Sequence, residues 1–402
     1  MTRARDAAAP AAPPRSVQAR EAGRPGARPP LRAAIACSGL GHVRRGNEMG
    51  ARVVADGLHR LGVDVVLFGG GPRPEVACRY ERIASLPREA AATRRLLSWH
   101  HRYLLEQYSF DFFLRRRLRR DRFDVVQVAD PALALRLHRA SPELATRVLY
   151  QDSQLLGPVW SSKFRWVQVL APHYRELARE AGVDTSGWSV VPYPVDTRRY
   201  APPADRAAVR AGLQGGALPA DAFVVLAVGD FSGGSNKRLD WVVREAAAAR
   251  TAAPLHLVLV GQASAAELEG FRRSARAVLG DRVHLAANVR PEEMPAWYAA
   301  ADVFVHAALR EPFGIVFLEA LATGVPVLAH PFAVTEWSVG PGGEMVDMTA
   351  PGRLAAALAA WEADPALRRS IGGAGRERAS AVFATERVVP LYLEAYERVL
   401  AG

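Results

Sequence analysis

The sequence predicts an α/β protein made of two doubly wound parallel sheets, and three observations lead to this class. Short apolar runs alternate with segments of helical pattern along most of the chain, which is typical of parallel sheets covered by helices. Four prolines between residues 192 and 203 interrupt the alternation, as expected of a linker between two domains. Residues 310–330 then predict a loop, a helix and a strand directly after another strand. This order places a ligand site at the carboxyl ends of parallel strands.

The first half of the chain supplies six predicted strands. The first, Leu31–Cys37, runs into the glycine-rich loop 38–46, and a helix is expected from there to about residue 60. The other five are short apolar runs separated by helical patterns: residues 63–68, 124–128, 147–150, 166–170 and 188–191. We therefore predict a first domain over residues 31–198.

The second half repeats this pattern and predicts a second domain over residues 199–384, facing the first across a cleft. Strands are expected at residues 223–228, 255–260, 283–285, 303–305 and 327–329. Helices are expected at residues 239–250, 264–279, 292–300, 315–323 and 351–362. A last helix, residues 385–400, carries an apolar stripe that must pack against another element: Leu391, Tyr392, Leu393, Tyr396 and Leu400.

Charge and cysteine content limit the class of protein further. The formal net charge is +11, but residues 1–30 and 94–122 supply +4 and +6 of it, so the remainder is nearly neutral. Residues 1–30 are rich in Ala, Pro and Arg and predict a disordered tail without the apolar core of a signal peptide. No run of eighteen uncharged apolar residues is present, and Cys37 and Cys78 suggest neither a disulfide framework nor a metal cluster. A cytoplasmic protein is the expectation.

Two acidic residues stand in the predicted loop and helix of residues 310–330. Glu311 precedes the helix and can reach sugar hydroxyls beside a phosphate bound at the helix N-terminus. Glu319 lies about one turn into the helix, where its carboxylate can accept both hydroxyls of a ribose. The alternative is that Glu311 only aids the N-cap and Glu319 is an ordinary helix-surface acid. The Pro-Phe-Gly turn after Glu311 and the Gly-Val-Pro-Val ending favour a nucleotide-sugar ligand over that alternative.

These residues resemble the E-x7-E motif of retaining glycosyltransferases of the family 4 type, which have the GT-B fold. The resemblance covers about residues 31–402 and is strongest from 223 to 345. It implies that Glu311 holds hydroxyls of the donor sugar, that Glu319 holds the ribose, and that a final helix, 385–402, crosses back to complete the first domain. It further implies that the sugar and diphosphate bind backbone N–H groups of Phe313, Gly314, Ile315 and Val316.

Two loops of the second domain extend the resemblance. Lys237, in a glycine-rich loop after a predicted strand, matches the family lysine that contacts the diphosphate, a suitable place for a mobile point charge. The family commonly has an arginine where this chain has Asp230, so the second cation must come from elsewhere, with Arg238 and Arg290 as candidates. Val289 and Arg290 match the loop that cups the nucleobase, whereas the following Trp297 and Tyr298 are expected to be helix core.

In the first domain, Gly39 and Gly41 match the family's glycine loop, which lets backbone approach phosphate and acceptor closely. A dinucleotide-binding fold is the competing interpretation. It is disfavoured because the glycine spacing differs from G-x-G-x-x-G, and because residues 69–71 are glycines where a ribose-binding acid would stand. His42 either orients the acceptor or has no function at the helix start. Asp130 is the other residue assigned to the acceptor side.

The chain departs from the family where the donor sugar would be recognised. Many members carry a histidine at the position of Ala129, where it reaches the far end of the sugar. One hypothesis is that the donor lacks a primary 6-hydroxyl; another is that a different residue reaches that group. The pair Tyr193-Pro194 also replaces the usual Asn-Gly and is expected to alter the hinge more than the chemistry.

The mechanism implied by the resemblance needs no carboxylate nucleophile of the glycosidase kind, and no such pair stands out. The leaving diphosphate itself accepts the acceptor's proton, while Lys237 and helix N–H groups stabilise the developing charge. Because no Asp-x-Asp motif flanks a strand end, we expect no metal requirement and no cofactor.

The arginine-rich stretch 115–120 lies in the domain expected to bind the acceptor. It is either a solvated helix face or a contact for an anionic acceptor or membrane surface, which would place the protein at the inner face of the membrane. Nucleic acid is disfavoured because no stacking platform accompanies the basic residues. A UDP-sugar is the first guess for the donor, on prevalence alone. The acceptor is left open as a small molecule, a glycan or a lipid-linked glycan.

Three other functions remain open from the sequence. A nucleotide-sugar epimerase would release isomerised or free sugar without an acceptor, and a phosphorylase would need inorganic phosphate and a sugar polymer. A non-catalytic nucleotide-sugar-binding protein would show no turnover, and the departures at Ala129 and Asp230 give that alternative some weight.

Overall fold

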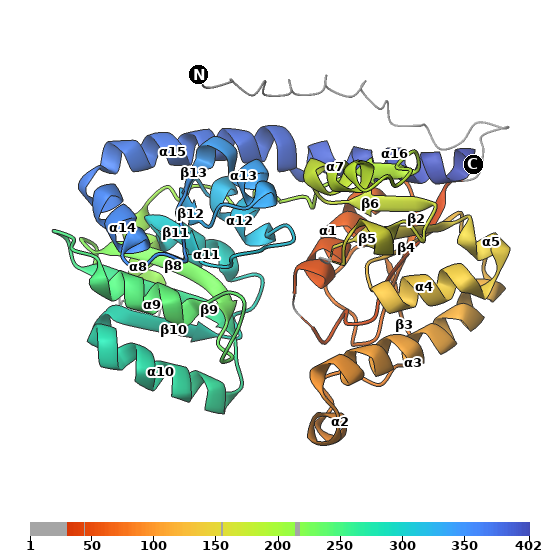
Figure 1. The fold of residues 1–402 in the computed structure, drawn as a ribbon, viewed down its shortest axis with the longest axis horizontal. Helices are drawn as coiled ribbons and strands as arrows, with labels where there is room; N and C mark the ends of the chain where they lie inside the picture. The colour runs from red at the N-terminus through yellow and green to blue at the C-terminus, as the bar shows by residue number, and fades with distance from the viewer. Residues whose placement is uncertain (1–29, 44, 154–155, 214–217) are drawn as a thin grey trace.

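The computed structural model describes residues 30–43, 45–153, 156–213 and 218–402, and has two parallel sheets, each covered by helices on both faces (Figure 1). The seven-stranded sheet has the order β3-β2-β1-β4-β5-β6-β7, and the six-stranded sheet has the order β10-β9-β8-β11-β12-β13. We call the parts built on these sheets the N-terminal and C-terminal lobes. The doubly wound α/β class is confirmed, while the tail predicted for residues 1–30 falls, apart from Pro30, outside the described residues.

The N-terminal lobe contains all six predicted strands and one more. Its strands are β1 (Arg32–Cys37), β2 (Asp64–Gly69), β3 (Arg79–Arg82), β4 (Val125–Val128), β5 (Val148–Asp152), β6 (Trp166–Val169) and β7 (Trp188–Val190). Its helices are α1 (Gly46–Arg60), α2 (Ala91–Leu96), α3 (Trp99–Arg120), α4 (Pro131–Ala140), α5 (Pro142–Ala145), α6 (Pro158–Ser161) and α7 (Pro172–Glu180). Strand β3 was not predicted because it is a short edge strand of charged residues around Tyr80, without an apolar run.

The C-terminal lobe contains the five predicted strands and the short edge strand β13. Its strands are β8 (Phe223–Asp230), β9 (Leu255–Gln262), β10 (Val283–Ala287), β11 (Val303–His306), β12 (Val327–Ala329) and β13 (Gly343–Met345). The predicted helices correspond to α9 (Leu239–Ala248), α10 (Ala265–Leu279), α11 (Met294–Ala300), α12 (Ile315–Ala322) and α14 (Arg353–Ala363). Helices that were not predicted are α8 (Arg206–Gly212), α13 (Ala333–Val339) and α15 (Pro365–Arg378).

The core of each lobe lies on both faces of its sheet, as parallel sheets require. In β1, Ile35 packs with α1 and the C-terminal helix, whereas its neighbour Ala34 packs on the opposite face with Phe110 of α3. The same alternation divides β8 of the other lobe, where Leu226 and Val225 belong to cores on opposite faces. The sheets are thereby fixed in orientation, and their carboxyl-end loops are held in place.

The chain ends on the lobe where it began. Helix α16 (Thr385–Ala401) packs against α1, and Figure 1 shows it lying along the N-terminal lobe. The hydroxyl of Tyr396 donates a hydrogen bond to Gln127 on β4, and the backbone N–H of Val195 donates to the carbonyl of Phe383 at 2.8 Å. Of the predicted apolar stripe, Tyr392 and Tyr396 are fully buried. Leu400 is exposed, so its expected packing is wrong.

Candidate functional site

The loop between β11 and α12 is the centre of the candidate site. Gly314 has a φ of 79°, and a Cβ there would lie 2.5 Å from the ring of Phe317, so only glycine fits the turn that begins α12. The side chain of Phe313 is buried and packs against Tyr193 at 5.6 Å between ring centroids. The turn is therefore rigid, and it presents the first N–H groups of α12, including that of Ile315, at the end of the sheet.

Glu311 stands in this loop at the centre of a buried polar cluster. Its carboxylate forms an ion pair with the ammonium of Lys237 and accepts a hydrogen bond from Nε2 of His306 at 3.0 Å. Burial alone would raise the pKa of Glu311, but Lys237 and the His306 hydrogen bond lower that pKa to about 2. Burial lowers the pKa of His306, so this histidine is neutral at pH 7 and Glu311 is ionised. The expected residues Glu311 and Lys237 thus meet, and His306 is an additional member.

The loop after β8 brings Lys237 to that cluster. A Cβ at Gly229 would lie 2.7 Å from the Cβ of Lys237, so this glycine lets the lysine lie close over the strand end. Arg238 has a positive φ of 52°, and its guanidinium donates to the carbonyl of Met348 at 2.8 Å while lying 4.7 Å from the centroid of the Trp241 ring. The Arg238 side chain therefore packs within its own lobe.

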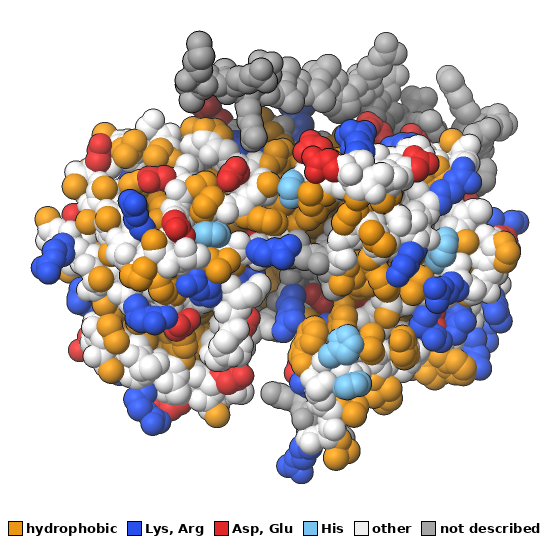
Figure 2. All heavy atoms as spheres, viewed as in Figure 1, with side chains coloured by type: hydrophobic (Ala, Val, Ile, Leu, Met, Phe, Trp, Pro, Cys, Tyr) orange, Lys and Arg blue, Asp and Glu red, His pale blue; other side chains and the backbone are white. Residues whose placement is uncertain are grey.

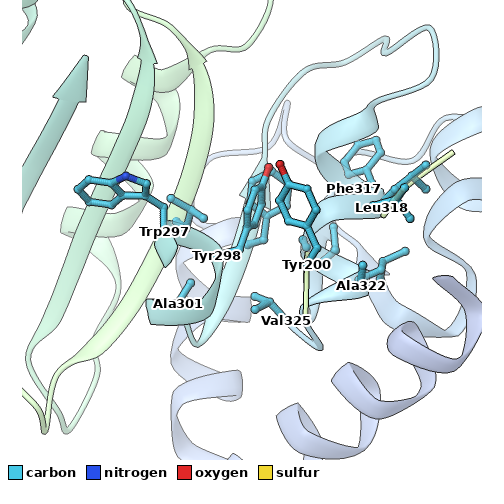
Figure 3. Packing of buried hydrophobic residues seen from close by; sticks show 14 of the residues in the cluster. Tyr200, Trp297, Tyr298, Ala301, Phe317, Leu318, Ala322 and Val325 are labelled. Atoms are coloured by element: carbon cyan, nitrogen blue, oxygen red, sulfur yellow. The ribbon is translucent and has the colours of Figure 1, made fainter. Parts of the chain in front are cut away.

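Glu319 is held by two tyrosines. Its carboxylate oxygens accept hydrogen bonds from the hydroxyls of Tyr200 at 2.8 Å and Tyr298 at 2.7 Å. Figure 3 shows the two hydroxyls pointing to the same place, with the rings edge to face. Burial raises the pKa of Glu319, and the hydrogen bonds partly offset that rise. Each carboxylate oxygen keeps a second lone pair, so the arrangement still allows a diol to bind.

The expected base loop lies beyond β10. Val289 packs partly buried against the core, whereas the Arg290 side chain is exposed and forms an ion pair with Glu293 at 2.6 Å. Within the described residues, Arg290 forms no hydrogen bond or ion pair with Lys237 or Glu311. Tyr298 is fully buried, as expected of helix core, but it also serves Glu319, a role that was not predicted.

The glycine loop of the N-terminal lobe packs tightly on its own lobe. Gly41 has a φ of 93°, and a Cβ there would lie 2.3 Å from the carbonyl oxygen of Pro72. A Cβ at Gly39 would lie 2.4 Å from a carboxylate oxygen of Glu48. Gly41 is therefore required by its backbone conformation and packing, whether or not a ligand approaches the loop, whereas the close contact at Gly39 is to the end of a flexible side chain.

His42 and Asp130 belong to a hydrogen-bond network behind that loop. Glu106 of α3 is fully buried, lies 2.9 Å from Nε2 of His42, and accepts two hydrogen bonds from the guanidinium of Arg88. Burial alone would raise the pKa of Glu106, but these partners lower it to about 2. Asp130 accepts a hydrogen bond from the backbone N–H of Ser38 at 2.7 Å and so fixes the start of the loop. The sequence did not predict the roles of Arg88 and Glu106.

The two lobes meet at their helix starts. The hydroxyl of Tyr174 on α7 donates to the carbonyl of Pro312 at 2.5 Å, and a Cβ at Gly46 would lie 3.7 Å from the side chain of Ile315. The starts of α1 and α12 therefore face each other across the interface, and Figure 2 shows the surface notched between the lobes. The donor-side and acceptor-side residues expected from sequence lie on opposite sides of this junction.

Two features relevant to cofactors and membranes can be stated for the described part of the chain. It contains no group of three or more His, Cys, Asp or Glu side chains arranged to hold a metal ion. None of its helices combines the length and apolar character needed to cross a bilayer.

Comparison with known proteins gives one family and several relatives. Residues 222–364 match the family described as glycosyl transferases group 1. D-inositol 3-phosphate glycosyltransferase of Kineococcus radiotolerans is 32% identical over 305 residues, which cover 70% of this chain and 68% of the relative. The enzyme of the same name from Geodermatophilus obscurus is 32% identical, but the match covers 63% of this chain and only 56% of that relative. Lipopolysaccharide core biosynthesis glycosyltransferase LpsD of Rhizobium meliloti is 26% identical over 376 residues, covering 90% and 98%.

Solved structures support the fold. Sucrose-phosphate synthase from Thermosynechococcus elongatus is similar with a TM-score of 0.75 at 23% identity, over 92% of this chain and 99% of that structure. HepE from Anabaena, in complex with UDP and glucose, is similar with a TM-score of 0.70 at 17% identity, over 91% and 99%. The similarity to structures at these identities shows a shared fold.

Proposed function

Because the chain belongs to the glycosyl transferases group 1 family, we propose that it moves a sugar from a nucleotide diphosphate-sugar to an acceptor hydroxyl, with retention of configuration. The observation that carries the proposal is the cluster of Lys237, Glu311 and His306 beside the start of α12. A cation, a buried carboxylate and free helix N–H groups at one strand end suit a ligand that carries both phosphate and hydroxyls.

In this proposal the C-terminal lobe, residues 199–384, holds the donor. Lys237 turns from Glu311 toward the diphosphate, and Glu311 then accepts hydroxyls of the sugar. Glu319, oriented by its two tyrosines, accepts the ribose hydroxyls. The backbone of Val289 and Arg290 meets the base, and N–H groups of residues 313–316 bind the phosphates and sugar.

The transfer step follows from this placement. The bond between the anomeric carbon and the diphosphate oxygen breaks, and the acceptor oxygen bonds to that carbon on the same face. The acceptor's proton passes to the leaving diphosphate oxygen, so no protein base is needed. Lys237 and the N–H groups of α12 stabilise the charge on the diphosphate, and each such preorganised donor contributes about 3–4 kcal/mol. No metal or cofactor takes part in this scheme.

The N-terminal lobe, residues 31–198 completed by residues 385–402, is assigned to the acceptor, with His42 and the buried Asp130 shaping the loop that would meet it. The donor proposed is a UDP-sugar, in line with the UDP in the HepE complex. Ala129 is buried and offers no polar group to a 6-hydroxyl, which supports a donor that lacks one. A glycan or lipid-linked acceptor is proposed because LpsD is named for lipopolysaccharide core biosynthesis.

We also propose that the N-terminal lobe contacts an anionic membrane from the cytoplasmic side through α3. Of the arginine run, Arg115 and Arg117 are neutralised by ion pairs, whereas Arg116, Arg119 and Arg120 are exposed. The aromatic side chains of Phe112 and Phe113 are exposed on the same helix, and Figure 2 shows basic and hydrophobic side chains together over this region. Exposed arginines beside exposed aromatic rings suit an anionic lipid surface, where each basic residue adds about 1 kcal/mol.

A groove of about 420 Å³ lies between α3 and α4 on this face, and we propose that it binds a lipid phosphate. Its walls include Arg115, Arg136 and Arg139, and the first two share the buried carboxylate of Asp111.

Flotation with anionic vesicles should recover the protein, and changing Arg116, Arg119 and Arg120 to Glu should prevent that recovery. The same change at Arg272, Arg273 and Arg276 on α10 is the matched control and should leave flotation unchanged. Equal recovery on neutral vesicles would contradict the proposed contact.

The main proposal is tested by nucleotide release from a donor panel, with and without cell extract as a source of acceptors. Release that requires extract is expected, and Glu311→Gln should abolish it. Glu377→Gln, at an exposed site on α15, should leave release unchanged. An isomerised sugar formed without extract would indicate an epimerase. Release that depends on inorganic phosphate would indicate a phosphorylase. Binding of the donor without turnover would indicate a non-catalytic protein.

A further inference from the structure

The charges around the start of α12 do not suit a diphosphate on their own. Lys237 is matched by Glu311, and Asp230 at the end of β8 adds a second carboxylate. Burial lowers the pKa of His306, so this side chain contributes no charge at pH 7. The local sum of these side chains is −1, and an incoming diphosphate would add at least two more negative charges. A further cation is needed for binding.

The two arginines expected from sequence are occupied elsewhere. Arg238 donates to the carbonyl of Met348 at 2.8 Å and packs on Trp241, and its backbone lies in the left-handed region. Moving that guanidinium would leave the carbonyl without its donor. Arg290 is paired with Glu293 in the exposed base loop. Neither arginine is placed to balance Asp230 and Glu311.

Within the described part of the loop between β11 and α12, Arg310 is a cation that has no carboxylate partner. It directly precedes Glu311, its side chain is exposed, and it forms no hydrogen bond or ion pair with any carboxylate among the described residues. Its guanidinium carbon lies 6.0 Å from the centroid of the Phe332 ring. The neighbouring carbonyl of Pro312 is fixed by Tyr174, so the backbone that carries Arg310 is held at the lobe junction.

The sheet order brings Arg310 to the same ligand as Lys237. Strand β11 lies between β8 and β12, with Val305 paired to Ala227 on one side and Leu328 on the other. The loops after these three strands therefore adjoin at one edge of the sheet. Lys237 already crosses from the β8 loop to Glu311, and Arg310 stands one residue before that contact.

We propose that Arg310 binds the diphosphate of the donor and supplies the second positive charge of the site. This assignment rests on the proposed function, since it presumes a nucleotide diphosphate ligand. A guanidinium suits the task because its planar donors can bind two phosphate oxygens at once. The rival is Arg45 at the start of α1, whose guanidinium lies 5.8 Å from the centroid of the Trp99 ring, on the other lobe.

The test compares binding of a nucleoside diphosphate with binding of the nucleoside alone. Wild-type protein is first titrated with UDP, GDP and ADP, and the tightest of the three is used with its nucleoside. Arg310→Ala should weaken binding of the diphosphate about ten- to a hundredfold, since a hydrogen bond to a charged group is lost. The affinity for the nucleoside should not change. Arg310→Lys should lose less than Arg310→Ala, because it retains the charge but not the two-point contact. Arg272→Ala, on the surface of α10, is the control and should bind as wild type.

Unchanged nucleoside binding shows that the Arg310 variant is folded. If Arg310→Ala lost affinity for the nucleoside and the diphosphate equally, or lost affinity for neither, the assignment of Arg310 would be overturned. Loss of diphosphate binding in Arg45→Ala but not in Arg310→Ala would assign the charge to the other lobe and also overturn it. Failure of the wild type to bind any of the three diphosphates would instead refute the proposed function itself.

Discussion

Each lobe holds a buried carboxylate against a cation, but the two pairs differ in how closed they are. In the N-terminal lobe, Glu106 and Arg88 have side chains 0% and 5% exposed, and His42 completes the set around Glu106. In the C-terminal lobe, the side chains of Glu311 and Lys237 are 10% and 24% exposed. The first pair is sealed on all sides, so it serves as scaffold. The second can open toward the lobe junction, so its partners can be exchanged for those of a ligand.

This difference predicts the largest effect on stability at Glu106. Glu106→Gln should lower the free energy of unfolding by about 3–5 kcal/mol, because the buried Arg88 guanidinium loses the carboxylate that accepts two of its hydrogen bonds. Urea denaturation measures the loss. Glu143→Gln, at an exposed pair with Arg122, should cost less than about 1 kcal/mol. A loss at Glu106 no larger than that at Glu143 would show that the N-terminal pair is not scaffold.

The largest effect on activity is expected at Glu311. Glu311→Gln should reduce sugar transfer by about a hundredfold or more, because the donor is no longer held in position for the reaction. The free energy of unfolding should change less than in Glu106→Gln, since Lys237 is partly exposed and can be solvated. Steady-state rates with the preferred donor measure the first quantity, and urea denaturation the second. A stable, fully active Glu311→Gln variant would contradict the comparison between the pairs.

Acid should affect both pairs. The pKa values of Glu106 and Glu311 are lowered in the fold from 4.5 to about 2, so each stabilises the folded protein at pH values above about 4.5. That stabilisation is lost as the pH falls from about 5 toward 2. Unfolding measured across this range should therefore show a shallower loss for Glu106→Gln than for the wild type. Parallel curves for the two proteins would show that Glu106 does not carry the acid sensitivity.

The smallest effect is expected at Asp230. Asp230 is half-buried; its carboxylate accepts a hydrogen bond from Ser232 and has no ion pair with any described cation. Asp230→Asn should increase the affinity for the nucleoside diphosphate about two- to fivefold, because it removes an electrostatic repulsion worth about 1 kcal/mol or less. The nucleoside should bind as before, and raising the salt concentration should shrink the difference. Weaker diphosphate binding in Asp230→Asn would mean that the carboxylate contributes a contact.

The site could be predicted from the sequence where it is built from short segments. The helix start at Gly314, the loop lysine Lys237 and the carboxylate Glu311 each follow from a local pattern, and the structure brings the last two together. Partners distant in sequence were missed, such as Tyr200, which lies 119 residues from Glu319, and Glu106, which lies 64 from His42. Glu106 was considered only for its charge, and Tyr200 lies in the stretch predicted to be a linker. Nothing in the sequence around either residue indicates its distant partner.

The same limit applies to the fold. Strands with apolar runs were predicted, whereas β3 and β13 lie at sheet edges, where polar residues are tolerated and the alternation disappears. The return of α16 onto the first lobe was implied by the family resemblance. The apolar stripe of this helix indicated only that it packs against another element. In the structure, the Tyr396 hydroxyl donates a hydrogen bond to Gln127, which lies 269 residues earlier in the chain.

The proposed donor site is tested most directly by soaking a crystal of this protein with a nucleotide diphosphate-sugar whose nucleotide is the one that binds best in the titration. We predict density for the diphosphate at the start of α12, with Lys237 within hydrogen-bond distance and the ribose at Glu319. Density for the nucleotide in the N-terminal lobe, with Lys237 still paired to Glu311, would contradict the account.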